Sequence, residues 1–481
     1  GSEMCIRDRF LARLLVLFSL VCISCAHSSF EQKQLKHALD FATSNRLELE
    51  ILLQHYTYDS LKLEAAKFLI RNMPHCYSYQ QGGEMDSVKR VRTYYSPFGQ
   101  IDQTYARRWG HYTYRNLPKI YDAHIITAEY LIDNIDRAFD NWQKRPWNRS
   151  LSFEDFCEYL LPYRIGDEPL EEWRELYEKK YGYLLDSIYK GSDVVEAANL
   201  VSRHLQEPVF IYCEDFELPH IGPRYLFSHR YGSCVDAADI VTYAFRAVGI
   251  PCMEDTDARG GHVWNVVRDT TGRDVPIWYI ASEAVRGSRD TGGYKRGKVY
   301  RPMYGFQEEK AAHLGDDWKS MPLLFYHPYM KDVSYAYYPD TLRILTGIPD
   351  DEVCYLAHFH EAHWWSCACA RSASGKMEIP NLESELVYLP MKYTKGNYYP
   401  SGFPFWFAGG EINTFLPDWE KTVKVRLYRK YPVYGWLRSF MSHVVGGTFE
   451  GSMTKDFEDG KRLYELSLIH ISEPTRLLSI S

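Results

Sequence analysis

Hydrophobic residues recur at helical spacing through the first 200 residues of the chain. Between residues 31 and 72 they form two stripes: Leu35, Ala38, Leu39 and Ala42, then Leu61, Ala65, Phe68 and Leu69. The same spacing recurs over 122–143, 152–163 and 169–187, and it is typical of helices that bury one face. Ser152, with Asp155 three residues later, predicts a capping box at the start of one of these helices. We therefore predict a helical N-terminal region over residues 26–215.

The pattern changes near residue 331. Short runs rich in β-branched and aromatic residues follow one another, separated by turn-forming residues: 333–339, 342–347, 352–360, 364–370, 385–393 and 422–430. Several short strands at close spacing are typical of a β-sandwich. We expect an α+β protein with an immunoglobulin-like β-sandwich over 331–443, preceded by a linker over 301–330. Residues 444–465 predict the start of a further domain.

Between these regions, residues 234–248 (CVDAADIVTYAFRAV) predict a helix with sharp limits. One apolar stripe runs along it, made of Val235, Ala238, Val241, Phe245 and Val248. Gly249 provides a C-terminal cap, and Pro251 prevents the helix from continuing. Farther on, residues 262–268 predict an apolar strand, 269–273 (DTTGR) a turn, and 274–280 the returning strand.

Cys234 stands at the first position of this predicted helix. Unpaired backbone N–H groups at a helix start favour an anion, so the thiol pKa is expected to fall below about 8.5. The Cys234 backbone amide could also hold an oxyanion. A nucleophilic cysteine needs a base, and His262 follows a Gly-Gly pair 28 residues later. Two alternatives remain open: the pair is a relic in a binding scaffold, or Cys234 forms a disulfide, with Cys252 as one partner.

The stretches YGSCVDAADIVTYAFRAVGIP and GGHVWNVV resemble the core of the transglutaminase-like superfamily, which has a papain-type Cys-His site. The resemblance covers about residues 216–285, and we place the core over 216–300. It implies Cys234 as nucleophile and His262 as general base and then acid. More weakly, LEAAKFLIRNMPHCYSY and LPYRIGDEPLEEWRELYEKKY resemble exported multidomain proteins of Bacteroidetes. In those proteins β-sandwich and discoidin-like domains follow, and residues 444–465 would fit the start of a discoidin-like domain.

The family pattern has a third catalytic residue besides the cysteine and the histidine, and this sequence departs from the family at that position. The family places an Asp beside the His on the next strand, whereas Trp278–Ile280 stand opposite His262 here. Asp274 is about five residues away along the strand, or about 16 Å. Glu283 could reach His262 if the strand bends, and it is the residue predicted for this role. A Cys-His dyad and a degenerate site remain alternatives.

Other chemistry is less strongly indicated. The net charge of −7 and the lack of a long basic run argue against nucleic-acid binding. Five residues within 358–369 could ligate zinc: His358, His360, His363, Cys367 and Cys369. Their period-two spacing also fits a β-hairpin, so we predict strands and no metal. No calcium-loop signature is present, and no cofactor is expected.

The chain ends carry processing and artefact signals. Residues 1–9 and 466–481 resemble translated sequencing adapter. Arg9 and Arg13 flank the start of a short apolar stretch within residues 10–25, which end in Ile23-Ser24-Cys25 and there resemble a bacterial lipobox. This predicts a signal peptide with Cys25 as the lipidated residue, a plain signal peptide being the alternative. We expect an exported protein in the periplasm or outer membrane, with membrane contact only through the lipid anchor.

Together these signals predict a cysteine enzyme that acts on amide bonds through a thioester, as a peptidase or amidase or by acyl transfer. The expected substrate is a protein or peptide, with a glycopeptide as an alternative. A non-catalytic exported protein that binds glycan or peptide is the competing interpretation, because a fold alone does not establish catalysis.

Overall fold

The structure is a computed structural model of the chain. It describes residues 30–83, 85–87, 89–90, 114–212, 218–259, 261–280, 282–289, 295–307, 321–345, 350, 352–360, 363–418, 420–421, 448–451 and 461–465. The adapter-like ends, the predicted signal segment with Cys25, and the predicted strand over 422–430 lie outside the described residues. In the described part, no helix is long and apolar enough to cross a membrane.

The chain divides into two compact units. The first comprises residues 1–294, 299–315 and 327–336, and the second comprises residues 295–298, 316–326 and 337–481. The predicted helical region and the predicted core, except residues 295–298, therefore belong to one unit. Helices and sheets both contribute, which confirms an α+β chain.

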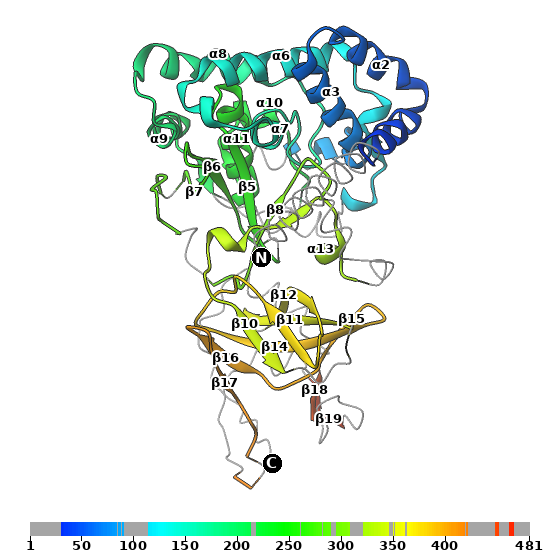
Figure 1. The fold of residues 1–481 in the computed structure, drawn as a ribbon, viewed down its shortest axis with the longest axis vertical. Coiled ribbons are helices and arrows are strands. Elements are labelled where there is room, and N and C mark those ends of the chain that lie inside the picture. The colour runs from blue at the N-terminus through cyan, green and yellow to red at the C-terminus, as the bar shows by residue number, and fades with distance from the viewer. Residues whose placement is uncertain are drawn as a thin grey trace, which may run out of the picture. The chain divides into compact units, whose positions relative to one another are not determined.

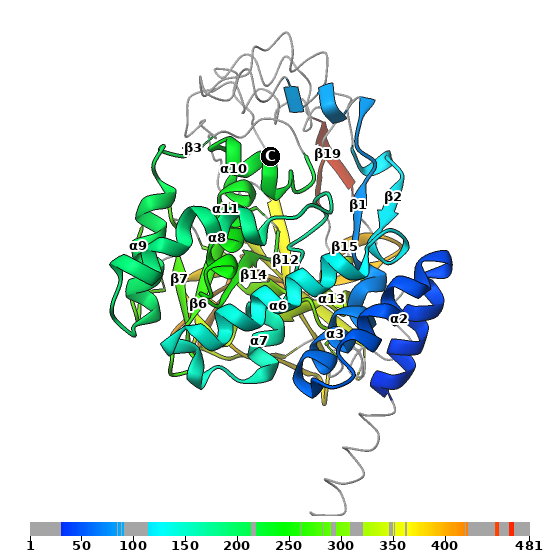
Figure 2. The ribbon, with the colours of Figure 1, turned by 90° about the horizontal axis from the view of Figure 1, so that it is seen from above.

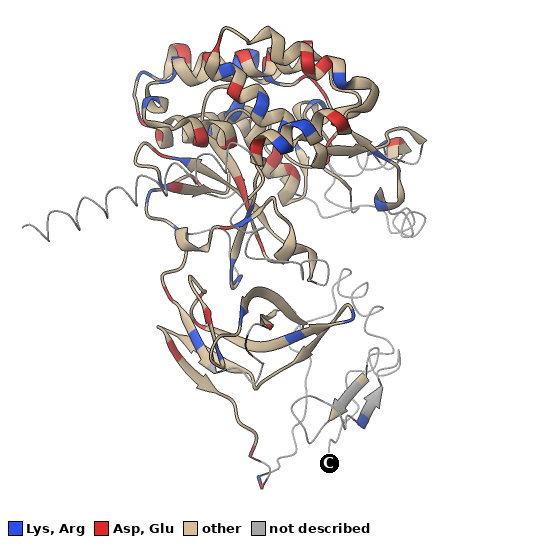
Figure 3. Ribbon diagram, turned by 45° about the vertical axis from the view of Figure 1, so that its right-hand side comes forward, with Lys and Arg blue, Asp and Glu red and all other residues tan. Residues whose placement is uncertain are grey.

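Helices dominate the first 250 residues, as the hydrophobic periodicity predicts (Figure 1). After a helix over 30–41 come α2 (Arg46–His55), α3 (Ser60–Asn72), α6 (Ala128–Lys144), α7 (Phe153–Tyr159), α8 (Arg174–Tyr183), α9 (Val194–Leu205), α10 (Pro223–Ser228) and α11 (Cys234–Ala247). Ser152 caps α7 by accepting from the Asp155 N–H at 3.0 Å, although the Asp155 carboxylate pairs with Arg268. Acidic and basic residues are interspersed over these helices (Figure 3).

A five-stranded antiparallel sheet completes the first unit, in the order β7-β6-β5-β8-β9. Its strands are β5 (Cys252–Asp257), β6 (Val263–Arg268), β7 (Asp274–Ile277), β8 (Val299–Pro302) and β9 (Met330–Asp332). Strand β7 is shorter than predicted. Strands β8 and β9 fall within or beside the stretch predicted as a linker, so that stretch contributes to the sheet. Short pairs also form between β1 (Tyr77–Tyr79) and β2 (Lys119–Tyr121), and between β3 (Ile211–Tyr212) and β4 (Tyr231–Gly232).

Helix α11 is the centre of the first unit. Helices α8, α9 and α10 surround it (Figure 2), and its other side packs on β5 and β6. Its apolar residues join those of β5, β6 and β7 in one buried cluster. The predicted helix limits are confirmed within one residue. The helix ends there because Gly249 adopts a φ of 81°, which few other residues tolerate.

The second unit is a β-structure. Its main sheet has the order β12-β11-β14-β16-β17, with β15 also paired to β14. The strands are β11 (Val353–His360), β12 (His363–Arg371), β14 (Leu386–Thr394), β15 (Asn397–Pro400), β16 (Phe405–Ala408) and β17 (Glu411–Thr414). Strands β10 (Leu342–Leu345) and β13 (Lys376–Ile379) form a separate pair, as do β18 (Thr448–Gly451) and β19 (Lys461–Glu465). The predicted strand over 333–339 is wrong: Ser334–Ala336 form a 3-10 turn in the first unit.

Candidate site around Cys234

Cys234 is the first residue of α11 and is 7% exposed. Ser233 is the N-cap, and its hydroxyl oxygen accepts from the Asp236 N–H while the Asp236 carboxylate accepts from the Ser233 N–H at 2.8 Å. Gly232 precedes this cap with a φ of 151°, which favours glycine. The capping box fixes the first turn, so the thiol stands at the positive end of a 14-residue helix dipole.

The directions of α11 and β6 bring Cys234 and His262 to the same end of the packed layers. The Asn265 side-chain amide, in the middle of β6, donates to the Ala238 carbonyl at 3.0 Å and to the Thr242 hydroxyl at 2.9 Å. At the other end, the Arg246 guanidinium donates to the Cys252 carbonyl at 3.2 Å, and Cys252 pairs with Val267. Helix and strand therefore run alongside each other in the same direction, and Cys234 and His262 stand where each begins.

Aromatic rings surround the His262 imidazole. Its ring centroid lies 4.2 Å from that of Trp278 and 5.6 Å from that of Trp264. The β6–β7 register pairs Asn265 with Ile277, so Trp278 follows opposite Trp264. An indole donates one hydrogen bond and accepts none. The Trp278 ring therefore lies beside the His262 imidazole.

Glu283, predicted as the third member, has a different role. Its carboxylate accepts from the Arg203 guanidinium at 2.6 Å, and both side chains are about half exposed. Strand β7 ends at Ile277, and a bridge from Trp278 to Ser282 turns the chain, which directs Glu283 to α9. No hydrogen bond joins Glu283 to His262 in the described chain. Asp274 does not serve either, because it is buried and paired with Arg301 and Arg268.

The alternative in which Cys234 forms a disulfide with Cys252 is wrong, since neither cysteine is in a disulfide. Burial and the nearby Glu254 raise the pKa of Cys252 to about 12, against the influence of Arg246. Residues 358–360 and 363–369 lie in the paired strands β11 and β12, as predicted. Among the described residues, no group of three or more His, Cys, Asp or Glu side chains could hold a metal ion.

A buried polar cluster farther along α11 was not predicted from the sequence. Both carboxylate oxygens of Asp239 lie within 3.0 Å of His220 Nδ1. This partner raises the pKa of His220 well above its usual value, against the effect of burial, and holds the imidazole charged. The nearby Thr242 hydroxyl donates to Glu254 at 2.7 Å. One signal was available, because Asp239 is a charged residue within a mostly apolar helix, but its partner is 19 residues away in a loop.

No protein-family model, curated protein or solved structure matches this chain. The resemblance to the transglutaminase-like superfamily therefore rests on the residues around Cys234 and His262. Two elements agree with its pattern: a cysteine that opens a capped helix and a histidine at the start of the adjacent hairpin strand. The orienting acid is the element that departs from it.

Proposed function

We propose that the protein is a transglutaminase-like cysteine enzyme that acts on amide bonds. One observation carries the proposal: Cys234 opens a capped, buried helix whose direction places it at the same end as His262. A helix start favours the thiolate over the thiol. The N–H groups of a first helical turn have no acceptor within the helix, so the Cys234 backbone amide is placed to donate to an oxyanion.

In the proposed reaction, His262 takes the Cys234 proton and the sulfur attacks the amide carbonyl carbon. The carbon–nitrogen bond then breaks, the imidazolium returns the proton to the leaving amine, and a thioester remains on Cys234. Water attacks the thioester to give a carboxylic acid, or a primary amine attacks to give a new amide. Either step frees the thiol, so bonds and protons balance without a cofactor.

Mass spectrometry of a protein-digest substrate tests the proposal. The full chain is incubated with the digest and a fluorescent primary amine in water enriched in oxygen-18. Hydrolysis introduces the isotope into new carboxylates, whereas acyl transfer attaches the amine. Both products must be absent with Cys234→Ala and must persist with Cys252→Ala, the matched buried thiol. Product formation by Cys234→Ala would rule out the thioester route.

One observation favours the second candidate, a non-catalytic binding scaffold. Alternation along β6 places Trp264 on the sheet face opposite to Asn265, and Asn265 faces α11. The His262 ring lies with Trp264 and Trp278. The proposed enzyme requires the imidazole to reach the thiol at the shared end of the layers.

We also propose a fold for the second unit and a cellular location for the protein. We place an immunoglobulin-like β-sandwich in the second unit because its strands are short, antiparallel and closely spaced. We place the mature protein outside the cytoplasm, anchored at Cys25. Detection of a diacylated N-terminal peptide would support the anchor, and its absence from membrane fractions would contradict it.

A further inference from the structure

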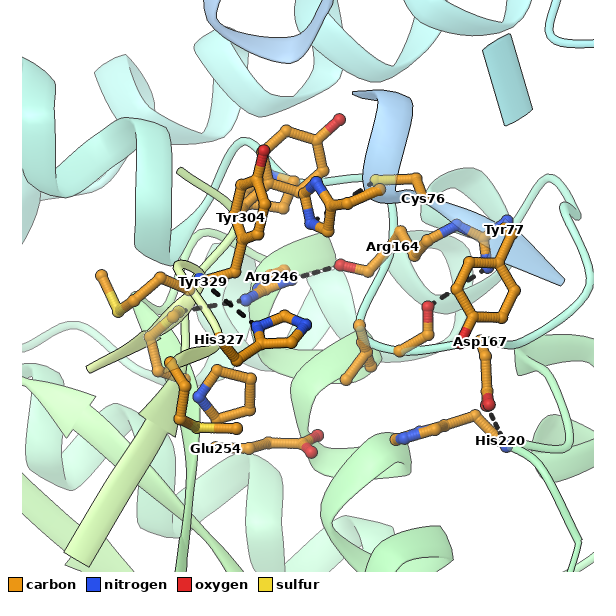
Figure 4. A pocket seen from close by; sticks show the side chains of 18 residues that line it. Cys76, Tyr77, Arg164, Asp167, His220, Arg246, Glu254, Tyr304, His327 and Tyr329 are labelled. Atoms are coloured by element: carbon orange, nitrogen blue, oxygen red, sulfur yellow. Dashed lines mark hydrogen bonds between the residues drawn. The ribbon is translucent and has the colours of Figure 1, made fainter. Parts of the chain in front are cut away.

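A pocket of about 280 Å³ lies in the first unit, beside the carboxyl-terminal half of α11 (Figure 4). Its described lining does not include Cys234 or His262. The residues that matter here are Arg246, Glu254, His220, Tyr304, Tyr329 and His75. They come from α11, β5, three loops and the short turn after α3, so several separate elements build the site.

Arg246 brings a buried positive charge to this pocket without a carboxylate partner. It is 4% exposed, and its guanidinium donates to the carbonyls of Cys252, Arg164 and Glu158 and to the Met253 sulfur, at 3.2–3.5 Å. No carboxylate of the described residues lies within 4.0 Å of it. Two other buried arginines in this unit differ, because Arg164 pairs with Asp122 and Arg301 pairs with Asp255. Because Arg246 has no such ion pair among the described residues, burial lowers the pKa of its guanidinium.

Glu254 faces the same pocket. The Thr242 hydroxyl donates to one of its carboxyl oxygens at 2.7 Å, and the other oxygen makes no hydrogen bond within the described chain. Burial raises the pKa of Glu254 to about 8, with a contribution from Asp239, while His220, the Thr242 hydrogen bond and Arg246 act in the opposite direction. Glu254 is therefore largely protonated at pH 7 and carries a hydroxyl that can donate a hydrogen bond.

Aromatic rings form the rest of the pocket wall. The His75 ring stacks on Tyr329 with centroids 3.6 Å apart, and it meets Tyr304 edge-on at 5.9 Å. Burial lowers the pKa of His75 to about 3, so this imidazole is uncharged. Its Nδ1 is buried and has no hydrogen-bond partner among the residues that the structure describes. The wall thus suits a flat or apolar group with one polar atom.

We propose that this pocket binds a small organic carboxylate, with the carboxylate on Arg246 and Glu254 and the apolar body against His75, Tyr304 and Tyr329. A guanidinium has five N–H donors, and the four contacts of Arg246 leave one N–H that can donate to a ligand carboxylate. That carboxylate would also accept from the Glu254 hydroxyl. Arg246 follows Cys234 by twelve residues on α11, or about 18 Å along the helix axis. The site is therefore separate from the thiol and goes beyond the proposed amide chemistry.

Isothermal titration of the full chain at pH 7 tests this site. Acetate, phenylacetate and benzoate are compared with acetamide, phenylacetamide and benzamide. We expect at least one carboxylate to bind at least tenfold more tightly than its amide. Arg246→Met should abolish that difference, whereas Arg203→Met, a surface control, and Cys234→Ala should retain it. Equal binding of every acid and its amide, or no binding of any acid, would overturn the proposal.

Glu254→Gln provides a second test that does not depend on the folding of Arg246→Met, since glutamine can still accept from Thr242. In the native chain, carboxylate binding should weaken at least threefold between pH 7 and pH 9, because Glu254 loses its proton and then repels the ligand. In Glu254→Gln the affinity should stay constant over this range. The same pH dependence in both proteins would contradict the role of Glu254.

Discussion

The two ends of α11 are held in different ways. Its carboxyl end is fixed by side chains from about 100 residues earlier: Asn141 donates to the Ala247 carbonyl, Arg145 to that of Val248, and Trp147 and Asn148 to that of Gly249. Its amino end is capped by its own neighbours, Ser233 and Asp236. The helical region thus anchors one end of α11, and the other end presents Cys234.

This difference indicates that α11 anchors the fold at its carboxyl end and presents the thiol at its amino end. Orphan carbonyls at a helix end need partners, and buried ones need them most. The distant side chains satisfy them and join the helical region to the core in one unit. The first turn relies on a local capping box, so its stability is independent of those distant contacts. Changes at the carboxyl end should therefore affect global stability, and changes at the amino end should affect the thiol environment.

Among the substitutions that test this difference, Trp147→Ala should cause the largest loss in the free energy of unfolding. Trp147 is 5% exposed, belongs to the buried cluster around α11, and donates to the Gly249 carbonyl at 2.9 Å. We expect a loss of about 3–5 kcal/mol in the free energy of unfolding, as for other buried aromatic residues, measured by urea denaturation of the full chain. The fully exposed Tyr58→Ala should change it by less than about 0.5 kcal/mol. Equal effects would show that the anchor is unimportant.

Comparing the stability of Gly249→Ala with that of Gly272→Ala isolates the effect of close packing around Gly249 at the carboxyl end of α11. Both glycines have similar positive φ angles, 81° and 76°. A Cβ at Gly249 would lie 2.9 Å from the Asn141 carbonyl oxygen, whereas a Cβ at Gly272 would meet nothing within 4 Å. We expect a loss of about 1 kcal/mol for Gly272→Ala from backbone strain, and about 1–3 kcal/mol more for Gly249→Ala from overpacking. Equal losses in thermal or urea unfolding would contradict the packing argument.

Ser233→Ala tests the amino end. It removes the side-chain acceptor of the Asp236 N–H, and such caps contribute about 1 kcal/mol. We expect a loss of that size, together with faster hydrogen exchange in the first turn of α11 and unchanged exchange near Gly249. Ser192→Ala, an exposed loop position, is the control. Faster exchange along the whole helix would show that the two ends are not independent.

Glu283→Gln should have the smallest effect. Its ion pair with Arg203 is about half exposed, and such pairs contribute about 0–1 kcal/mol. We expect stability to change by less than about 1 kcal/mol and the alkylation rate of Cys234 to stay the same. A lower alkylation rate would restore Glu283 as a candidate partner of His262.

The sequence predicted α11 well because its signals are local. The apolar stripe, Gly249 and Pro251 define the helix, and the DTTGR turn is confirmed by Asp269, whose carboxylate accepts from the Thr271 and Arg273 N–H groups. Features that depend on distant partners were missed. Strand β8 pairs with β5 more than 40 residues earlier, and no local pattern indicates that pairing.

The candidate site shows the same limit. Cys234 could be placed at a helix start from its neighbours alone. Glu283 was assigned wrongly because the end of β7 at Ile277 and the bridge that follows cannot be predicted from residue type. Arg246 lay within the predicted helix, but its lack of a carboxylate partner depends on how Arg164, Cys252 and Glu158 surround it.

The most direct test of the central claim is the rate of Cys234 alkylation by iodoacetamide as a function of pH. The rate is followed by mass spectrometry, so that the other cysteines are counted separately, in the native chain and in His262→Ala. We predict a rate that stays high well below pH 7 in the native chain and falls in the variant, because a thiolate–imidazolium pair is lost. A rate that rises only through about pH 8.5, identical in both proteins, would mean an ordinary thiol and would contradict the proposed enzyme.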